Sequence, residues 1–240
     1  MSLSWRRSRA ILRKELAEYR RNRLLVVGMA ILPLVFIIQP LIAVLTLGRE
    51  ASGGLAHEHV LVYLLGIPVL VPVIAAGSAV AGERTQGTLE PALTTPIRHD
   101  ELLLGKALAA LVPSLVIAYA VFALYLVLVG LFAQPGIAAA LIQAPDLLAQ
   151  LLFTPLLATW SIWVGIGVSA RSSDVRVAQQ LGLVASLPPV FVVLLIALDA
   201  IPATPALALG GAALLLVLDV LGWRVDVRLF DRERLITGTR

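Results

Sequence analysis

The longest polar interruption in the first half of this sequence runs from Gly82 to Lys106 and reads GERTQGTLEPALTTPIRHDELLLGK. It gathers carboxylates that can pair with basic residues, threonines that can hydrogen-bond, a central glycine and two prolines. Glycine and proline break and restart helices because their backbone angles differ from those of other residues. This is the chemistry of a bent binding segment rather than of a catalyst. The stretch is predicted to be a cytosolic segment that connects two membrane helices and is bound by another protein.

Catalysis or ion coupling inside a membrane needs ionisable groups at depth. The predicted spans are nearly free of charge, since Lys106, Asp199 and Asp219 lie toward span ends and no span contains histidine. An intramembrane hydrolase and a proton- or sodium-coupled carrier are therefore disfavoured. Neutral polar side chains in the spans either line a pathway or hydrogen-bond between helices. They are Gln39, Ser78, Ser114, Tyr119, Gln150, Thr154 and Ser161.

Metal, thiol and nucleotide sites are not predicted. His57, Glu58 and His59 are adjacent and do not share a helical face, and the chain has no cysteine. Gly82 and Gly87 have the glycine spacing of a nucleotide-binding loop, but Thr88 stands where its lysine should be. The chain is therefore expected to bind no metal and no cofactor, with any ATP and Mg²⁺ on a partner.

The composition is that of an integral membrane protein. Of the 240 residues 59% are hydrophobic and 14% charged, and the mean hydropathy is +0.94. A soluble protein is about half apolar and a quarter charged. The net charge of +4 is not gathered on a soluble face, so nucleic acid is not an expected partner. We predict an all-α integral membrane protein with one domain over residues 1–240.

Six uncharged or nearly uncharged runs are long enough to cross a bilayer. The first holds 24 residues, and about 20 residues span the hydrocarbon core. Prolines at positions 33, 40, 188 and 189 are expected to bend the spans that hold them. The predicted spans are residues 24–47, 60–82, 107–132, 147–170, 178–198 and 205–222, with 83–106 as the cytosolic segment between spans two and three.

Basic residues alternate between the segments that separate these spans. The N-terminal segment, the second and fourth loops and the C-terminal tail hold 18 of the 19 lysines and arginines. Because basic residues are retained on the cytosolic side, both termini and residues 83–106 are predicted to be cytosolic.

Residues 1–23 are predicted to form an amphipathic helix at the membrane surface. At 100° per residue, one stripe carries Trp5, Ser8, Leu12, Leu16 and Tyr19. Arginines lie off that stripe, where they would face anionic lipid. The alternative is a charged flank that only fixes orientation.

Two parts of the polar stretch closely resemble the cytosolic motif of type-2 ABC exporter permeases. Residues 83–90 read ERTQGTLE, similar to the family's E-x-x-x-G-T-L-E segment after the second span. Residues 95–106 read TPIRHDELLLGK, similar to its T-P-[IL]-x-x-x-E-[LI]-x-x-G-K segment before the third. The basic N-terminal helix, six spans and cytosolic termini fit the same family, so the resemblance covers the whole chain.

The resemblance implies a coupling helix that sits in a groove of an ATPase, beside the N-terminal helix. It also implies two ATPase subunits and a second permease subunit, identical or different. The residues that match the ATPase-contacting part are Glu83, Gly87, Thr88, Leu89 and Glu90. Those that match the part that restarts the helix are Thr95, Pro96, Glu101, Gly105 and Lys106.

These residues also have physical roles of their own. Gly87 is expected to end the helix of the second span. Thr95 and Pro96 are expected to be the N-cap and first residue of the next helix, with acids in its early turns. Glu83 and Glu90 are expected to pair with basic residues of the ATPase or of the N-terminal helix, although a solvated loop is the alternative.

The predicted function is the transmembrane subunit of an ATP-driven exporter in the plasma or inner membrane, with no enzymatic activity of its own. Its cargo is expected to be a small lipophilic or amphipathic compound, such as a drug, an antibiotic or a lipid. The alternative is an ATP-independent channel or scaffold whose polar stretch binds another cytosolic partner.

Overall fold

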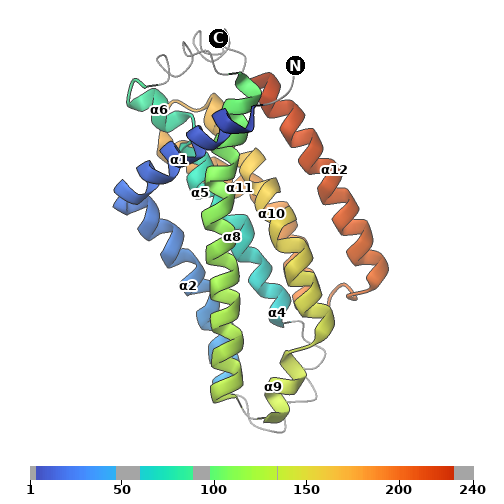
Figure 1. Ribbon diagram of the computed structural model, residues 1–240. Helices are drawn as coiled ribbons and strands as arrows, with labels where there is room; N and C mark the ends of the chain where they lie inside the picture. The colour runs from blue at the N-terminus through green and yellow to red at the C-terminus, as the bar shows by residue number, and fades with distance from the viewer. Residues whose placement is uncertain (1–3, 47–59, 89–97, 134, 230–240) are drawn as a thin grey trace.

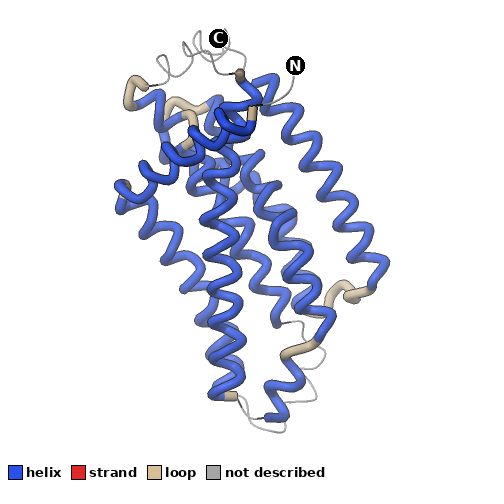
Figure 2. The backbone as a smooth tube through the Cα atoms, in the orientation of Figure 1, coloured by secondary structure: helices blue, strands red, loops and turns tan. Residues whose placement is uncertain are grey.

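The computed structural model describes residues 4–46, 60–88, 98–133 and 135–229, and these ranges contain helices and no β-strand (Figures 1 and 2). The prediction of an all-α membrane protein is confirmed. The helices are α1 (Trp5–Arg21), α2 (Arg23–Thr46), α4 (Val60–Tyr63), the 3₁₀ helix η2 (Leu64–Gly66), α5 (Ile67–Ser78), α6 (Ala81–Thr85), α8 (His99–Phe132), α9 (Pro135–Leu141), α10 (Ala144–Arg171), α11 (Val175–Ala197) and α12 (Pro205–Leu229).

Five helical stretches in the described residues are long and apolar enough to cross a membrane, and up to six if the bent pair of α1 and α2 counts as one span. The five are Leu61–Thr85, His99–Phe132, Ala144–Arg171, Val175–Ala197 and Pro205–Leu229. The prolines of α2 and α11 lie inside these helices. Apolar helices are the expected form because every backbone polar group is satisfied within the helix.

The stretch Leu61–Thr85 is the central helix of the bundle. Its most apolar window is 89% buried by protein, whereas the windows of the other four stretches are 11–39% buried. Glycines let neighbouring helices approach it closely. A Cβ at Gly165 of α10 would lie 2.7 Å from the Cβ of Ala76, and one at Gly182 of α11 would lie 3.0 Å from Val73. Small residues at such contacts are the usual means by which membrane helices pack.

The N-terminal helix α1 lies across the bundle rather than along it. It meets the described part of α2, Val26–Ile42, at an angle of 77°. In Figure 1, α1 crosses the same end of the bundle at which α6 lies and α8 begins, and α12 ends on this side. We call this the α1 end of the bundle.

The face that α1 turns inward differs from the predicted stripe. Ser8, Ile11 and Glu15 are buried against the protein, whereas Trp5 is 59% exposed. The other predicted members, Leu12, Leu16 and Tyr19, are half-buried. The helix therefore turns a polar-lined stripe toward α8, and the exposed Trp5 lies away from that contact.

The helix of the third predicted span includes the last part of the predicted cytosolic segment. Its first residue is His99, and its N-cap is Arg98. The backbone N–H of Arg98 donates to the Glu101 carboxylate at 3.3 Å, which ties down the first turn. The predicted N-cap Thr95 and first helical residue Pro96 lie outside the described residues. Asp100 and Glu101 stand in the first turn of α8, where acids were expected.

Two carboxylates of α12 are buried at its contact with α10. Asp219 is 8% and Asp226 2% exposed, and one oxygen of each has no hydrogen-bond partner among the described residues. The helices pack closely here, since a Cβ at Gly222 would lie 2.7 Å from the Cβ of Trp163. Because α12 continues to Leu229, Asp219 lies well inside the helix and not toward its end, as the sequence had suggested.

Candidate coupling site

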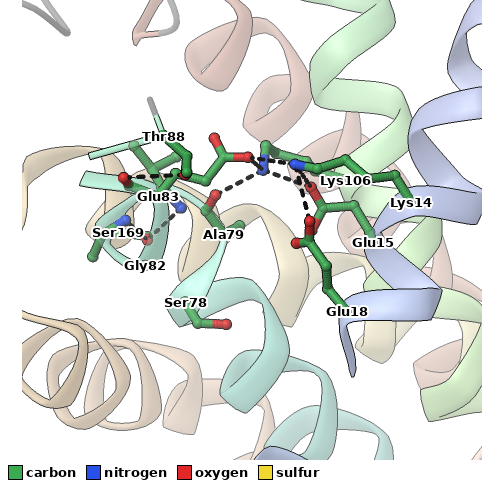
Figure 3. A network of polar contacts seen from close by, with 12 residues as sticks. Lys14, Glu15, Glu18, Ser78, Ala79, Gly82, Glu83, Thr88, Lys106 and Ser169 are labelled. Carbon is green, nitrogen blue, oxygen red and sulfur yellow. Dashed lines mark hydrogen bonds and ion pairs between the residues drawn. The ribbon is translucent and has the colours of Figure 1, made fainter. Parts of the chain in front are cut away.

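A buried lysine on α8 joins three helices at the α1 end of the bundle (Figure 3). The ammonium group of Lys106 donates to Glu15 Oε1 of α1 and to the Ala79 carbonyl, both at 2.9 Å. Glu83 Oε1 of α6 also lies 2.9 Å from Lys106 Nζ. The Lys106 side chain is 1% exposed. An ammonium group has three N–H donors, and these three oxygens match them.

A second lysine, on α1, reinforces this contact from the outside. Lys14 Nζ lies 3.3 Å from Glu83 Oε1 and 3.3 Å from Glu18 Oε1. Glu83 therefore receives two cations, one buried and one half-exposed. We call Lys14, Glu15, Glu18, Glu83 and Lys106 the ion cluster. Buried charges are tolerated when they are paired in this way, because an unpaired charge has lost its hydration without compensation.

The surrounding carboxylates change the pKa of Lys14. Partial burial alone lowers the pKa of its ammonium group, but the charges of Glu83, Glu15 and Glu18 outweigh that effect. The pKa is therefore raised from its ordinary value of 10.5. Lys14 therefore keeps its positive charge at neutral pH.

The end of α6 turns sharply at Gly87, as the sequence predicts. Gly87 has a φ of +68°, which glycine adopts without the steric penalty that other residues meet. The backbone N–H of Gly87 donates to Arg84 O at 3.2 Å, and that of Thr88 to Glu83 O at 2.9 Å. This pair of bonds is the Schellman helix ending. The glycine thus stops the helix one turn after Glu83 enters the ion cluster.

The other side of α6 is fixed to the end of α10. The backbone N–H groups of Val80 and Ala81 donate to Ser169 Oγ at 3.1 and 3.0 Å. The Arg84 guanidinium donates to the carbonyls of Ala170 and Ser172. Carbonyls at a helix end have no partner within the helix, so a cation is favourable there. The short helix α6 is therefore attached to α1, α8 and α10 at once.

A second set of contacts holds the start of α1 on α8. The Glu101 carboxylate accepts from the backbone N–H of Ser4 at 2.9 Å and lies 3.4 Å from the guanidinium of Arg7. One turn further along α8, Gly105 leaves room for α1. A Cβ there would lie 2.6 Å from Ile11 Cβ and 3.1 Å from Ser8 O. Only glycine allows this approach without displacing α1.

The structure brings together the predicted coupling residues that it describes. These are Glu83, Gly87, Thr88, Glu101, Gly105 and Lys106, while Leu89, Glu90, Thr95 and Pro96 lie outside the described residues. The sequence analysis did not select Glu15. An acid close to the apolar stripe of α1 could have indicated a buried ion pair. Glu83 was expected to pair with basic residues of the ATPase or of the N-terminal helix, and its Oε1 atom faces Lys14 of α1 together with Lys106 of α8. An ATPase contact of Glu83 stays a prediction.

The predicted pathway residues are scattered between helix contacts. Ser161 Oγ donates to Val69 O of α5, and Tyr119 OH donates to Leu151 O of α10 at 3.2 Å. Ser78 bonds within its own helix, to Ala75 O. Ser114, Gln150 and Thr154 are buried, and the Gln39 side chain is not among those described. The bonds of Ser161 and Tyr119 fit the helix-to-helix alternative, and a pathway through the seven residues stays a prediction.

The fold and the ion cluster define a polytopic helical membrane protein. The polar segment after its second span is held against its N-terminal helix by ion pairs. The sequence matches the family described as "ABC-2 family transporter protein" over residues 9–221. The chain therefore belongs to this family, and it is the transmembrane subunit of an ABC transporter. A comparison with curated proteins gives no match. In the described part of the chain, no group of three or more His, Cys, Asp or Glu side chains is placed to hold a metal ion.

Proposed function

We propose that this chain is the permease of an ATP-driven exporter and that α6 couples a partner ATPase to the membrane helices. The observation that carries the proposal is the ion cluster, in which Lys106 joins α6, α1 and α8 within 2.9 Å contacts. A short helix fixed to three neighbours cannot move alone. A push on α6 is therefore transmitted as a rigid-body movement to the helices around it.

The proposed assembly has two ATPase subunits that bind ATP and Mg²⁺ and a second permease subunit, identical or different. The α1 end of the bundle faces the cytosol in the plasma or inner membrane. This orientation is supported by the basic residues, because those of the N-terminal segment and the α12 tail belong to this end. A nucleotide site is not expected in this chain. The energy of ATP hydrolysis must therefore be transmitted from the ATPase to the membrane helices through contacts at the α1 end.

The proposed cargo is a small lipophilic or amphipathic compound, such as a drug, an antibiotic or a lipid. Its support is the apolar character of the five spanning helices, which offer such a molecule favourable contacts. Their exposed side chains are mostly aliphatic, as on α11 and α12. A bare ion would need charged or carbonyl-lined positions along its path.

Purification from the native host in mild detergent, followed by identification of the copurifying proteins, tests this function. The expected result is a roughly stoichiometric ATPase whose turnover changes when candidate cargo is added. An intact permease without an ATPase would instead support an ATP-independent channel or scaffold.

A further inference from the structure

A row of arginines covers the side of α1 that faces away from α8. Arg6, Arg9, Arg13 and Arg20 are exposed. None of these four side chains makes a hydrogen bond or an ion pair with another residue in the described part of the chain. Their spacing of three, four and seven residues puts them on one side of a helix, opposite the inward face. We call these four residues the arginine row.

The arginine row lies beside the apolar edge of α1. Trp5 is 59% exposed, and Leu12 and Leu16 are half-buried next to the row. Between Arg6 and Arg20 the helix rises about 21 Å, at 1.5 Å per residue. Because α1 meets α2 at 77°, this length runs close to the plane of a membrane that α2 crosses. Arginines flanking an apolar edge in that plane reach the level of lipid phosphates.

We infer that the arginine row is a binding surface for anionic phospholipid headgroups of the cytosolic leaflet. Charge complementarity and the membrane-parallel course of α1 favour lipid over an acidic protein surface. Bound lipid also has a regulatory role, which depends on the ion cluster. Since Glu15 and Lys14 tie α1 to α6 and α8, headgroups held by the arginine row act on the coupling helix, and anionic lipid becomes a ligand that regulates ATP turnover. This regulatory part rests on the proposed function, whereas the binding part does not.

The binding is tested on the purified permease alone, by native mass spectrometry with added phosphatidylglycerol or phosphatidylcholine. The wild-type chain should retain phosphatidylglycerol preferentially, and added salt should weaken that preference. The variant Arg9→Gln/Arg13→Gln/Arg20→Gln should bind it on the order of a hundredfold more weakly, because each basic residue near an anionic surface contributes about fivefold. The matched control Arg176→Gln/Arg224→Gln/Arg228→Gln removes the same charge from exposed positions of α11 and α12.

Equal loss in the two triple variants, or no preference for phosphatidylglycerol in the wild type, would overturn the binding surface. The second arm places permease and ATPase in nanodiscs with increasing phosphatidylglycerol. Turnover should respond to that lipid in the wild type and the control variant, but not in the arginine-row variant. If the arginine-row variant keeps its lipid preference and instead loses the ATPase, the surface binds protein and the inference is wrong. If no ATPase associates at all, the proposed function fails while the lipid measurement stands.

Discussion

The α1 end of the bundle and the α10–α12 contact both bury carboxylates against a neighbouring helix, but only at the α1 end do these carboxylates make ion pairs in the described part of the chain. Glu15 and Glu83 share Lys106 at 2.9 Å. Asp219 and Asp226 make no ion pair among the described residues, and each keeps an oxygen without a hydrogen-bond partner, as Glu83 does. Both contacts are otherwise tightly packed through a glycine, at Gly105 and Gly222.

The difference separates two uses of buried charge. At the α1 end, paired charges hold three helices in one arrangement, and removing Lys106 takes the buried cation away from both Glu15 and Glu83. At the α10–α12 contact, the aspartates weaken a contact that aromatic packing already supplies, since Trp163 and Trp223 lie edge to face at 5.5 Å. Because buried acids without an ion pair do not stabilise their own contact, we expect Asp219 and Asp226 to have a functional role.

The largest effect is expected for Lys106→Met. It leaves two buried carboxylates without their shared cation, and breaking such a pair costs about 3–5 kcal/mol. Thermal unfolding of the detergent-solubilised protein should show a strongly lowered midpoint. Adding Glu15→Gln and Glu83→Gln to the same chain should restore much of the loss, because the unpaired charges are then gone. A loss no larger than that of an exposed substitution would show that the ion cluster does not hold the helices together.

The two glycine contacts can be compared directly with Gly105→Ala and Gly222→Ala. The new Cβ would meet Ile11 at 2.6 Å or Trp163 at 2.7 Å, and overpacking of this kind costs about 1–3 kcal/mol. Gly130→Ala on α8 is the control, since nothing lies within 4 Å of its Cβ. The control should leave the unfolding midpoint unchanged or slightly raised. Three equal results would contradict the close packing at both contacts.

The opposite sign is expected for Asp219→Leu. Removing a buried acid that lacks a partner should stabilise the α10–α12 contact by about 1–3 kcal/mol, the cost of leaving such a group unsatisfied. The unfolding midpoint should rise while cargo transport falls, if the acid is kept for function. A midpoint lowered as far as in Lys106→Met would show that both regions use charge in the same way.

The smallest effect is expected at the end of α6. Gly87→Ala forces a side chain into a left-handed backbone conformation and should cost about 1–2 kcal/mol. Gly87→Asn should cost less, because asparagine tolerates that conformation. The pair is measured by thermal unfolding and by stimulation of the ATPase. Identical results for alanine and asparagine would mean that the backbone angle at Gly87 does not matter.

The sequence predicted the membrane class and most helix positions well because long apolar runs have few alternatives in lipid. It placed the start of the third span at residue 107, where the apolar run begins, and expected the helix itself to begin earlier, in the polar segment. Residues 99–106 do continue the helix, held by the Arg98 and Glu101 contact. The exact first residue could not be predicted, because arginine is not a residue type that commonly caps a helix.

The ion cluster was only half visible in the sequence. Lys106 and Gly105 stood out through a family resemblance, but no local pattern links Lys106 to Glu15. The face of α1 that packs on α8 was also not predicted, because the sequence analysis followed the more apolar stripe of Trp5, Leu12 and Leu16, which was expected at the membrane surface. The close contact of Ile11 with Gly105 marks the packed face instead. A helix that meets both protein and lipid has two packing faces, and apolarity alone identifies only one of them.

The 91-residue separation of Glu15 and Lys106 has a consequence for biogenesis. Synthesis proceeds from the N-terminus, so α1 reaches the membrane well before Lys106 has been made. Until α8 is inserted, the face of α1 that carries Ser8, Ile11 and Glu15 has nothing to pack against. The ion cluster can therefore form only after α8 has been inserted. In a chain that stalls or inserts wrongly, the Ser8, Ile11 and Glu15 face of α1 stays accessible to cellular proteases.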